Sequence, residues 1–132
     1  MITAVFDASA VVRALTGSDV AAARLEDVAA SRSLAGAPDL LYAEVANALV
    51  QYVRAGRLSA AEADEALDYV TALPFESTPC EELAPDALNV AIGCGVSAYD
   101  AMYLALAEAT DSMLVTADRR LAAATTRAEF VD

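Results

Sequence analysis

Residues 2–12 read ITAVFDASAVV, and this stretch decides the fold because a strand-forming run meets an aspartate and then a helix-forming run. The β-branched and aromatic residues of 2–6 predict a short buried strand. A helix is predicted from Ser9 or Ala10 to Leu15, so Asp7 lies between the strand and the helix. A strand that leads directly into a helix is typical of a parallel sheet with helices on its faces.

The same pattern returns near the other end of the sequence. Met113 to Thr116 predicts a second buried strand, and Asp118 stands two residues beyond it, before a short helix through Ala124. The hydrophobic spacing predicts further helices at 19–30, 39–56, 60–73, 84–93 and 97–109, and further strands at 34–36, 74–78 and 129–131. Short apolar strands separated by helices predict an α/β fold with a central parallel sheet, formed by one domain over residues 1–132.

Several residues are expected at the beginnings of helices. Asp39 is a predicted N-cap for the helix at 39–56, and Ser59 to Glu62 has the pattern of a capping box. Pro85 is expected in the first turn of its helix, where the missing N–H has no partner in any case. Ser97 is expected to cap the helix that follows it.

The composition is that of a packed protein, since 58% of the 132 residues are hydrophobic. No apolar run approaches the ~18 residues that a membrane helix needs. The first residues, MITAVFDAS, lack the basic start and the cleavage site of a secretory signal. Cys80 and Cys94 have no metal-type spacing, and the simplest interpretation makes both small core residues of a reduced, cytoplasmic protein. A disulfide is the alternative.

The charged residues restrict the chemistry. The chain has no His, its eight basic residues are all Arg, and its formal net charge is −12. Catalysis that needs an imidazole or an amine is therefore excluded, which leaves carboxylates, hydroxyls and a hard metal ion. The acidic balance indicates modest affinity for a polyanion or a basic partner protein, although solubility alone also accounts for it.

Four acidic residues are embedded in apolar sequence: Asp7, Glu44, Asp100 and Asp118. Ligands of open parallel sheets bind beyond the C-terminal ends of the strands, which is where Asp7 and Asp118 are predicted. Clustered carboxylates repel one another, and a divalent cation relieves that repulsion. Each residue also fits a simpler interpretation: the two aspartates after strands as N-caps, Glu44 as part of a solvated helix face, and Asp100 as the second member of a capping box with Ser97.

Two hydroxyl residues and two tyrosines accompany this acidic set. Ser9 and Thr116 stand two residues from the aspartates that follow the strands. Their hydroxyls are suited to hold a carboxylate, a water or a phosphate oxygen, and they also fit a helix start and a strand end. Tyr99 and Tyr103 lie one helical turn apart and are expected to pack in the core.

Four stretches together resemble the PIN-domain ribonucleases, specifically the VapC-type toxins of toxin–antitoxin pairs. The matching stretches are FDASAVV, LLYAEVANAL, VSAYDAMYLALA and LVTADRRLA, in the order of that family and over nearly the whole chain. The resemblance implies a PIN fold with a parallel sheet of about five strands. It also implies a site in which Asp7, Glu44, Asp100 and Asp118 bind Mg²⁺ or Mn²⁺, with Ser9 and Thr116 as catalytic-site neighbours.

The resulting hypothesis is metal-dependent hydrolysis of an RNA phosphodiester by an endoribonuclease toxin. The expected partners are the RNA substrate, an antitoxin protein and a second copy of the chain, with no membrane. A PIN nuclease outside toxin–antitoxin systems, acting in RNA processing, and a non-catalytic protein-interaction module are the alternatives. A phospho-accepting domain and a P-loop protein are disfavoured because both need a Lys, and no GxxxxGK[ST] motif is present.

Overall fold

Strand β1 runs through the middle of a five-stranded parallel sheet in the computed structural model, which describes residues 1–132. The strands are β1 (Ala4–Phe6), β2 (Ala35–Pro38), β3 (Glu76–Thr78), β4 (Met113–Thr116) and β5 (Ala128–Phe130). The helices are α1 (Ala8–Thr16), α2 (Asp19–Ala29), α3 (Leu41–Arg54), α4 (Ala60–Ala72), α5 (Cys80–Cys94), α6 (Ala98–Ala109) and α7 (Arg119–Ala123). The predicted α/β architecture is confirmed.

The strand order is β3-β2-β1-β4-β5, and every neighbouring pair is parallel. The chain therefore starts in the centre, builds one half of the sheet through β2 and β3, and returns to build the other half through β4 and β5. Ligands of open sheets bind where this order reverses, beyond the C-terminal ends of the strands. In this protein the reversal lies between β1 and β4.

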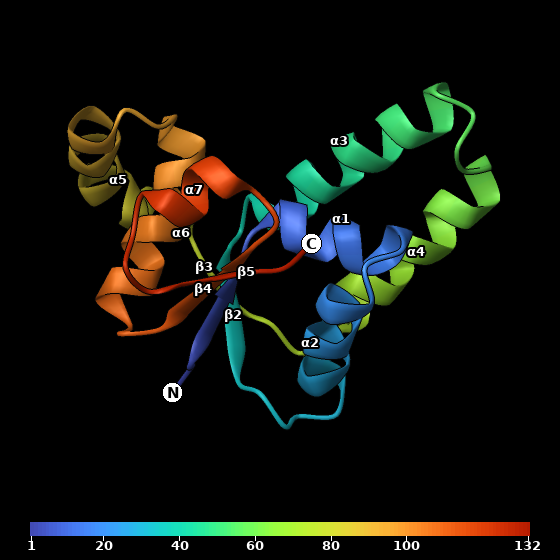
Figure 1. Cartoon of the computed structure of the whole chain (residues 1–132), viewed down its shortest axis with the longest axis horizontal. Helices are drawn as coiled ribbons and strands as arrows, with labels where there is room; N and C mark the ends of the chain where they lie inside the picture. The colour runs from blue at the N-terminus through green and yellow to red at the C-terminus, as the bar shows by residue number, and fades with distance from the viewer.

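Helices cover both faces of the sheet (Figure 1). Helix α6 contacts β1, β2 and β4, and α5 packs on α6. Helices α1 and α2 lie on the other side of the sheet. Helices α3 and α4 form an antiparallel pair that extends away from the sheet, an arm that we call the α3–α4 arm. The two sides of the molecule are therefore joined mainly through the sheet.

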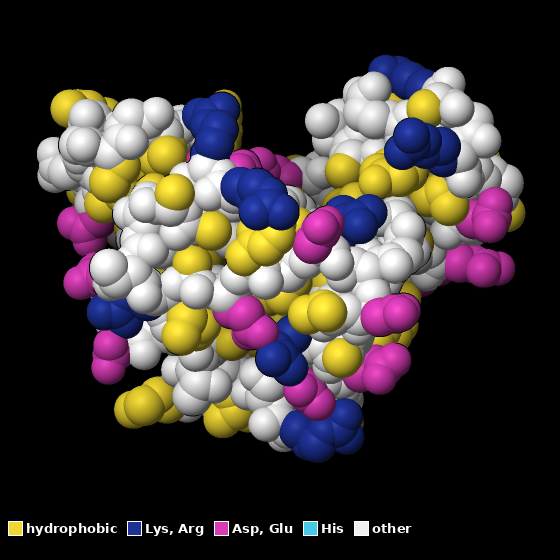
Figure 2. Space-filling model, in the orientation of Figure 1, with side chains coloured by type: hydrophobic (Ala, Val, Ile, Leu, Met, Phe, Trp, Pro, Cys, Tyr) yellow, Lys and Arg dark blue, Asp and Glu magenta, His cyan; other side chains and the backbone are white.

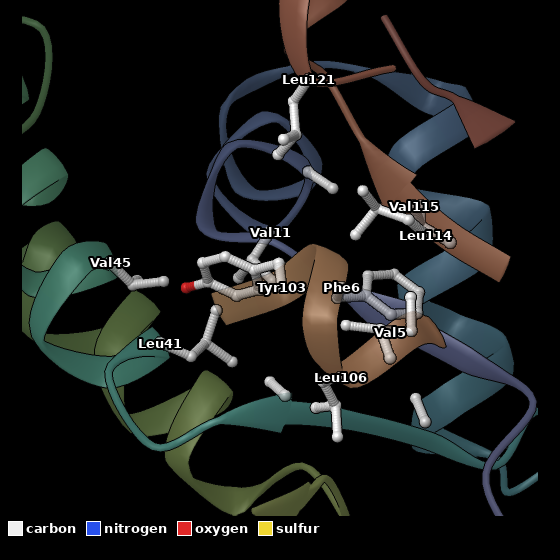
Figure 3. Close-up of a cluster of buried hydrophobic side chains, with 14 of the residues drawn as sticks. Val5, Phe6, Val11, Leu41, Val45, Tyr103, Leu106, Leu114, Val115 and Leu121 are labelled. Carbon is white, nitrogen blue, oxygen red and sulfur yellow. The ribbon is translucent and has the colours of Figure 1, made fainter. Parts of the chain in front are cut away.

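The core lies between the central strands and their helices. Figure 3 shows Val5 and Phe6 of β1 beside Leu114 and Val115 of β4, all of them almost fully buried. Gly36 lies in β2 where a Cβ atom would be 2.9 Å from the carbonyl oxygen of Glu76. Since real Cβ contacts are longer than this, β2 and β3 pair closely only because residue 36 is glycine.

Two predicted helix starts were wrong. Asp39 does not cap α3, which begins without a side-chain cap. Its Oδ1 instead accepts a hydrogen bond of 3.0 Å from the backbone N of Cys80. Helix α5 therefore begins at Cys80, four residues before its predicted start, and Pro85 lies inside it. The cap comes from the end of the neighbouring strand β2, a partner that local sequence does not reveal.

Other local predictions are confirmed or corrected residue by residue. The capping box over Ser59 to Glu62 is present, and the Oγ of Ser97 caps α6.

Cys94 is exposed at the last position of α5, so its predicted placement in the core was wrong, and Cys80 is partly buried. Neither cysteine forms a disulfide. No single helix is long and apolar enough to span a membrane; α5 and α6 meet the length and composition criterion only as a pair bent by 110°.

Candidate active site

Asp7 is the most buried acidic side chain of the site. Only 4% of it is exposed, and both carboxylate oxygens are engaged. Oδ1 accepts hydrogen bonds from the Ser9 hydroxyl at 2.7 Å and from the backbone N of Ala10 at 2.9 Å. Oδ2 accepts one of 2.5 Å from the Thr116 hydroxyl. Asp7 therefore does cap α1, as the simpler interpretation holds, and it also joins β1 to β4.

Burial dominates the ionisation of Asp7. Desolvation raises the pKa of its carboxyl above the ordinary value, because the charged form is disfavoured away from water. The hydrogen bonds from Thr116, Ser9 and Ala10 oppose this rise, and the negative charge of Asp100 adds to it. Folding thus places a carboxylate where it is costly to ionise without a compensating positive charge.

Ser9 and Thr116 form a hydroxyl network across the point where the strand order reverses. The Ser9 Oγ accepts a hydrogen bond of 2.9 Å from the backbone N of Ala117, and the Thr116 Oγ1 accepts one of 3.0 Å from the backbone N of Asp118. The two hydroxyl oxygens lie 3.3 Å apart. Thr116 is fully buried. Both hydroxyls therefore hold Asp7 and fix the turn that follows β4.

Asp118 caps the short helix α7. Its Oδ1 accepts hydrogen bonds from the backbone N of Arg120 at 2.9 Å and of Leu121 at 3.3 Å. Oδ2 takes no part in this cap. Asp118 is therefore an N-cap as the simpler interpretation holds, but only one of its oxygens is used in the cap. The second oxygen remains available for another ligand.

Asp100 lies in the first turn of α6 and is partly buried. The pKa of its carboxyl is raised, first by desolvation and then by the negative charge of Asp118; a hydrogen bond with Ser97 and the charge of Arg120 act in the opposite direction. The charge of Asp100 also raises the pKa of Asp7 and of Glu44. Asp100 thus interacts electrostatically with each of the other three carboxylates.

Glu44 leans into the molecule from the first turn of α3 instead of lying on a solvated face. Its Oε1 accepts a hydrogen bond of 2.6 Å from the hydroxyl of Tyr103 on α6. Desolvation raises the pKa of its carboxyl, and the bond from Tyr103 opposes the rise. Figure 3 shows the Tyr103 ring in the core beside Leu41 and Val45, with its hydroxyl oxygen directed toward α3.

Tyr103 is the site residue that the sequence did not single out. It was correctly placed in the core, with 1% of its side chain exposed, but its role in holding Glu44 depends on a partner 59 positions away. The matching prediction for Tyr99 was wrong, because 67% of that side chain is exposed. Tyr99 lies in the first turn of α6, before the helix passes along the sheet.

The four carboxylates influence one another but do not form a tight cluster. No group of three or more Asp, Glu or Cys side chains lies close enough to hold a metal ion in direct contact with all of them. The donor set nevertheless fits a hard cation. All available ligands are oxygens, the pKa is raised for three of the four acids, and Mg²⁺ keeps several waters and takes one or two carboxylates directly.

A hollow lies between the lobe formed by α5, α6 and α7 and the α3–α4 arm (Figure 2). Acidic side chains lie within it, and Arg side chains stand on both of its sides. A cavity of about 250 Å³ opens beside Ser9 and is lined also by Val12, Arg13, Ala48 and Ala117. A second, apolar groove of about 390 Å³ runs between α3 and α4, with Leu49, Val53 and Leu67 in its lining.

Comparisons with known proteins agree with this fold. The family model described as PIN domain matches residues 4–126. Ribonuclease VapC1 of Mycobacterium tuberculosis is 40% identical over 122 residues, which cover 91% of this chain and 89% of that protein. The crystal structure of PAE2754 from Pyrobaculum aerophilum aligns with a TM-score of 0.75 and 30% identity, over 96% of this chain and 82% of that one. A toxin–antitoxin complex from Klebsiella pneumoniae aligns with a TM-score of 0.66 and 18% identity, over 96% of each chain.

Proposed function

Because this chain belongs to the PIN domain family, we propose that it is a metal-dependent endoribonuclease and the toxin of a toxin–antitoxin pair. The observation that carries this proposal is the placement of Asp7, Thr116 and Asp118 at the reversal of the strand order, with Asp100 as their acidic neighbour. The similarity to Ribonuclease VapC1 over most of both chains supports the RNA-cleaving activity.

The residues proposed to surround Mg²⁺ or Mn²⁺ are Asp7, Glu44, Asp100 and Asp118, with one or two carboxylates in direct contact with the ion and the others reached through its bound waters. When bound, the divalent cation supplies positive charge that offsets the negative charge developing on the phosphate during hydrolysis. Hydrolysis adds the oxygen of a water to phosphorus and breaks the bond to the 3′ oxygen, which leaves 5′-phosphate and 3′-hydroxyl ends. The protein has to position that water, accept its proton and hold the strand.

The residues divide these tasks according to their surroundings. Three hydrogen bonds fix the position of the Asp7 carboxylate. Asp100 and Glu44 are partly buried and their pKa is raised. One of these two is proposed as the general base, because neither carboxylate is held on both oxygens as that of Asp7 is. Tyr103 acts as a positioning residue, because its hydroxyl orients Glu44.

An antitoxin partner and a second copy of the chain complete the proposal. The apolar groove between α3 and α4 offers Leu49, Val53 and Leu67 to a nonpolar segment of a partner. The acidic hollow beside it suits a basic side chain of the same partner, which would compete with the cation. This chain has the same fold as a chain in a toxin–antitoxin complex, and this similarity is consistent with such a partner.

The decisive experiment incubates purified protein with total RNA in Mn²⁺ and, separately, in EDTA, and sequences the new 5′ ends. Discrete 5′-phosphate ends that appear only with Mn²⁺ support the proposal. Asp100→Asn is expected to abolish them while the circular-dichroism spectrum is unchanged, and Asp64→Asn, on the exposed side of α4, is the matched control. A folded Asp7→Asn protein that cuts at the wild-type rate would contradict the site, and absence of both cleavage and Mn²⁺ binding would favour a non-catalytic interaction module.

A further inference from the structure

The arginines of this acidic chain fall into a paired and an unpaired group, and Arg24 belongs to the first through its ion pair of 2.7 Å with Glu129. Arg127 directly precedes β5 and Arg32 lies three residues before β2, at the edge where strands begin, and each is paired with a carboxylate. Arg32 lies 3.0 Å from Asp27, and Arg127 lies 2.7 Å from Asp111. At this edge the positive charges are already neutralised within the protein.

The arginines around the hollow are different. Arg54, Arg57, Arg119 and Arg120 form no ion pair with any carboxylate, although acidic residues outnumber basic ones by 20 to 8. Arg13 reaches only Asp132, at 3.6 Å, which is too long for a hydrogen bond. Figure 2 shows dark-blue Arg side chains on both sides of the hollow. Of these, Arg119 and Arg120 directly follow Asp118, and Arg13 lines the cavity beside Ser9.

Two of these arginines share one cavity. A space of about 520 Å³ between the C-terminal end of α1 and the turn that joins α3 to α4 is lined by Arg13, Thr16, Gly17, Tyr52 and Arg57, together with two leucines. The guanidinium of Arg57 lies over the Tyr52 ring, 5.9 Å from its centroid, a contact that restrains the side chain without using its N–H donors. Two guanidinium groups with free donors therefore face a common opening.

This cavity is connected to the candidate active site through Arg13. The same side chain lines the smaller cavity beside Ser9, and Ser9 and Arg13 lie one turn apart on α1, about 6 Å along the helix axis. A strand whose scissile phosphate lies at Ser9 and Asp7 would thus place a neighbouring part of its backbone at Arg13 and Arg57.

We propose that the Arg13–Arg57 cavity is a binding site for a backbone phosphate of single-stranded RNA, outside the metal-binding acids. The inference rests on the proposed ribonuclease function, and it adds how a chain of net charge −12 holds a polyanion. Planar guanidinium groups bind phosphate oxygens through two parallel hydrogen bonds. The nearby acids repel phosphate, so local positive charge is required before the strand can reach them.

The test measures RNA binding apart from cleavage. A fluorescein-labelled single-stranded RNA is titrated with the full-length protein in EDTA, at several salt concentrations, using wild type, Arg57→Ala, Arg13→Ala and Arg57→Lys. We expect Arg57→Ala to weaken binding about tenfold and to reduce the slope of log affinity against log salt by about 0.7, the value for one phosphate contact of a single strand. Arg57→Lys should recover the slope. Arg32→Ala, which removes the same charge from the opposite edge, should behave as wild type.

The possible results separate this inference from the proposed function. If wild type cuts RNA in Mn²⁺ but Arg57→Ala binds RNA as Arg32→Ala does, the cavity is not a phosphate site and the ribonuclease assignment stands. If Arg57→Ala lowers only the melting temperature, or only the affinity for an antitoxin, the inference is equally overturned. If wild type binds RNA with an unchanged slope for every variant and never cuts it, both fail.

Discussion

Thr116→Val tests the contact that joins the two central strands at the site. Valine keeps the shape of threonine and removes its hydroxyl. That hydroxyl is fully buried, donates to the Oδ2 of Asp7 at 2.5 Å and accepts from the backbone N of Asp118 at 3.0 Å. The substitution therefore leaves a buried carboxylate oxygen and a backbone donor without these partners.

The expected cost is larger than for most threonine hydroxyls. A hydrogen bond to a charged group contributes about 1.5–3 kcal/mol, and one between neutral groups about 0.5–1.5 kcal/mol. Since the variant loses one of each, its free energy of unfolding should fall by about 2–4 kcal/mol near neutral pH. For a chain of this length, that loss lowers the melting temperature by roughly 6–15 °C.

The loss should depend on pH in a defined direction. The Thr116 hydroxyl lowers the pKa of Asp7, which means that it favours the ionised carboxylate in the folded protein. Its stabilising effect is therefore present at pH values where Asp7 is ionised and is lost as the pH falls and Asp7 becomes protonated. The difference in stability between wild type and Thr116→Val should thus be larger at about pH 8 than at about pH 5.

Urea denaturation in EDTA, followed by circular dichroism at both pH values, measures this difference. Thr110→Val is the matched control, because the Thr110 hydroxyl donates to the backbone oxygen of Leu106 at 2.7 Å and has no carboxylate partner. Equal losses for the two valine variants at the higher pH would refute the conclusion that Thr116 holds an ionised Asp7.

Three further predictions concern other parts of the structure. Tyr103→Phe removes the donor to Glu44, so the free energy of unfolding should fall by about 1–2 kcal/mol in urea titrations and RNA cleavage should fall as well; unchanged cleavage would show that Tyr103 only packs. Gly36→Ala places a Cβ atom 2.9 Å from a backbone carbonyl of β3 and should destabilise the protein by about 1–3 kcal/mol, which calorimetry would contradict if the melting temperature were unchanged. Mn²⁺ at a hundredfold excess over its dissociation constant should stabilise the EDTA-treated protein by about 2.7 kcal/mol, and Asp100→Asn should reduce this effect; an equal shift in that variant would place the ion elsewhere.

Local sequence predicted most of the fold because the hydrophobic spacing and the turn residues are themselves local. The strand at 113–116 has the predicted bounds, and the helix after Ser59 has its capping box. The relation between Asp7 and Asp118 also followed from sequence, because each comes after a strand and parallel strands end at one edge of a sheet. These features need no knowledge of distant partners.

The features that sequence did not predict all depend on contacts between distant residues. Asp39 caps a helix that begins 41 positions later, and Tyr103 holds a carboxylate 59 positions away. Tyr99 has the spacing of a core residue but is exposed, since α6 reaches the sheet only after its first turn. Which arginines lack an acidic partner could not be predicted either, because pairing is decided by the fold.

The reversal of strand order also sets the time at which the candidate site is completed during synthesis of the protein. β1 leaves the ribosome first, but the Thr116 hydroxyl that binds Asp7 is encoded 109 residues later, an interval of roughly 5–20 s at ordinary rates of translation. Until β4 emerges and docks, Asp7 lacks this partner and the candidate site is incomplete. Under the proposed ribonuclease function, the ribosome and the message that produce this protein would be shielded from it throughout that delay.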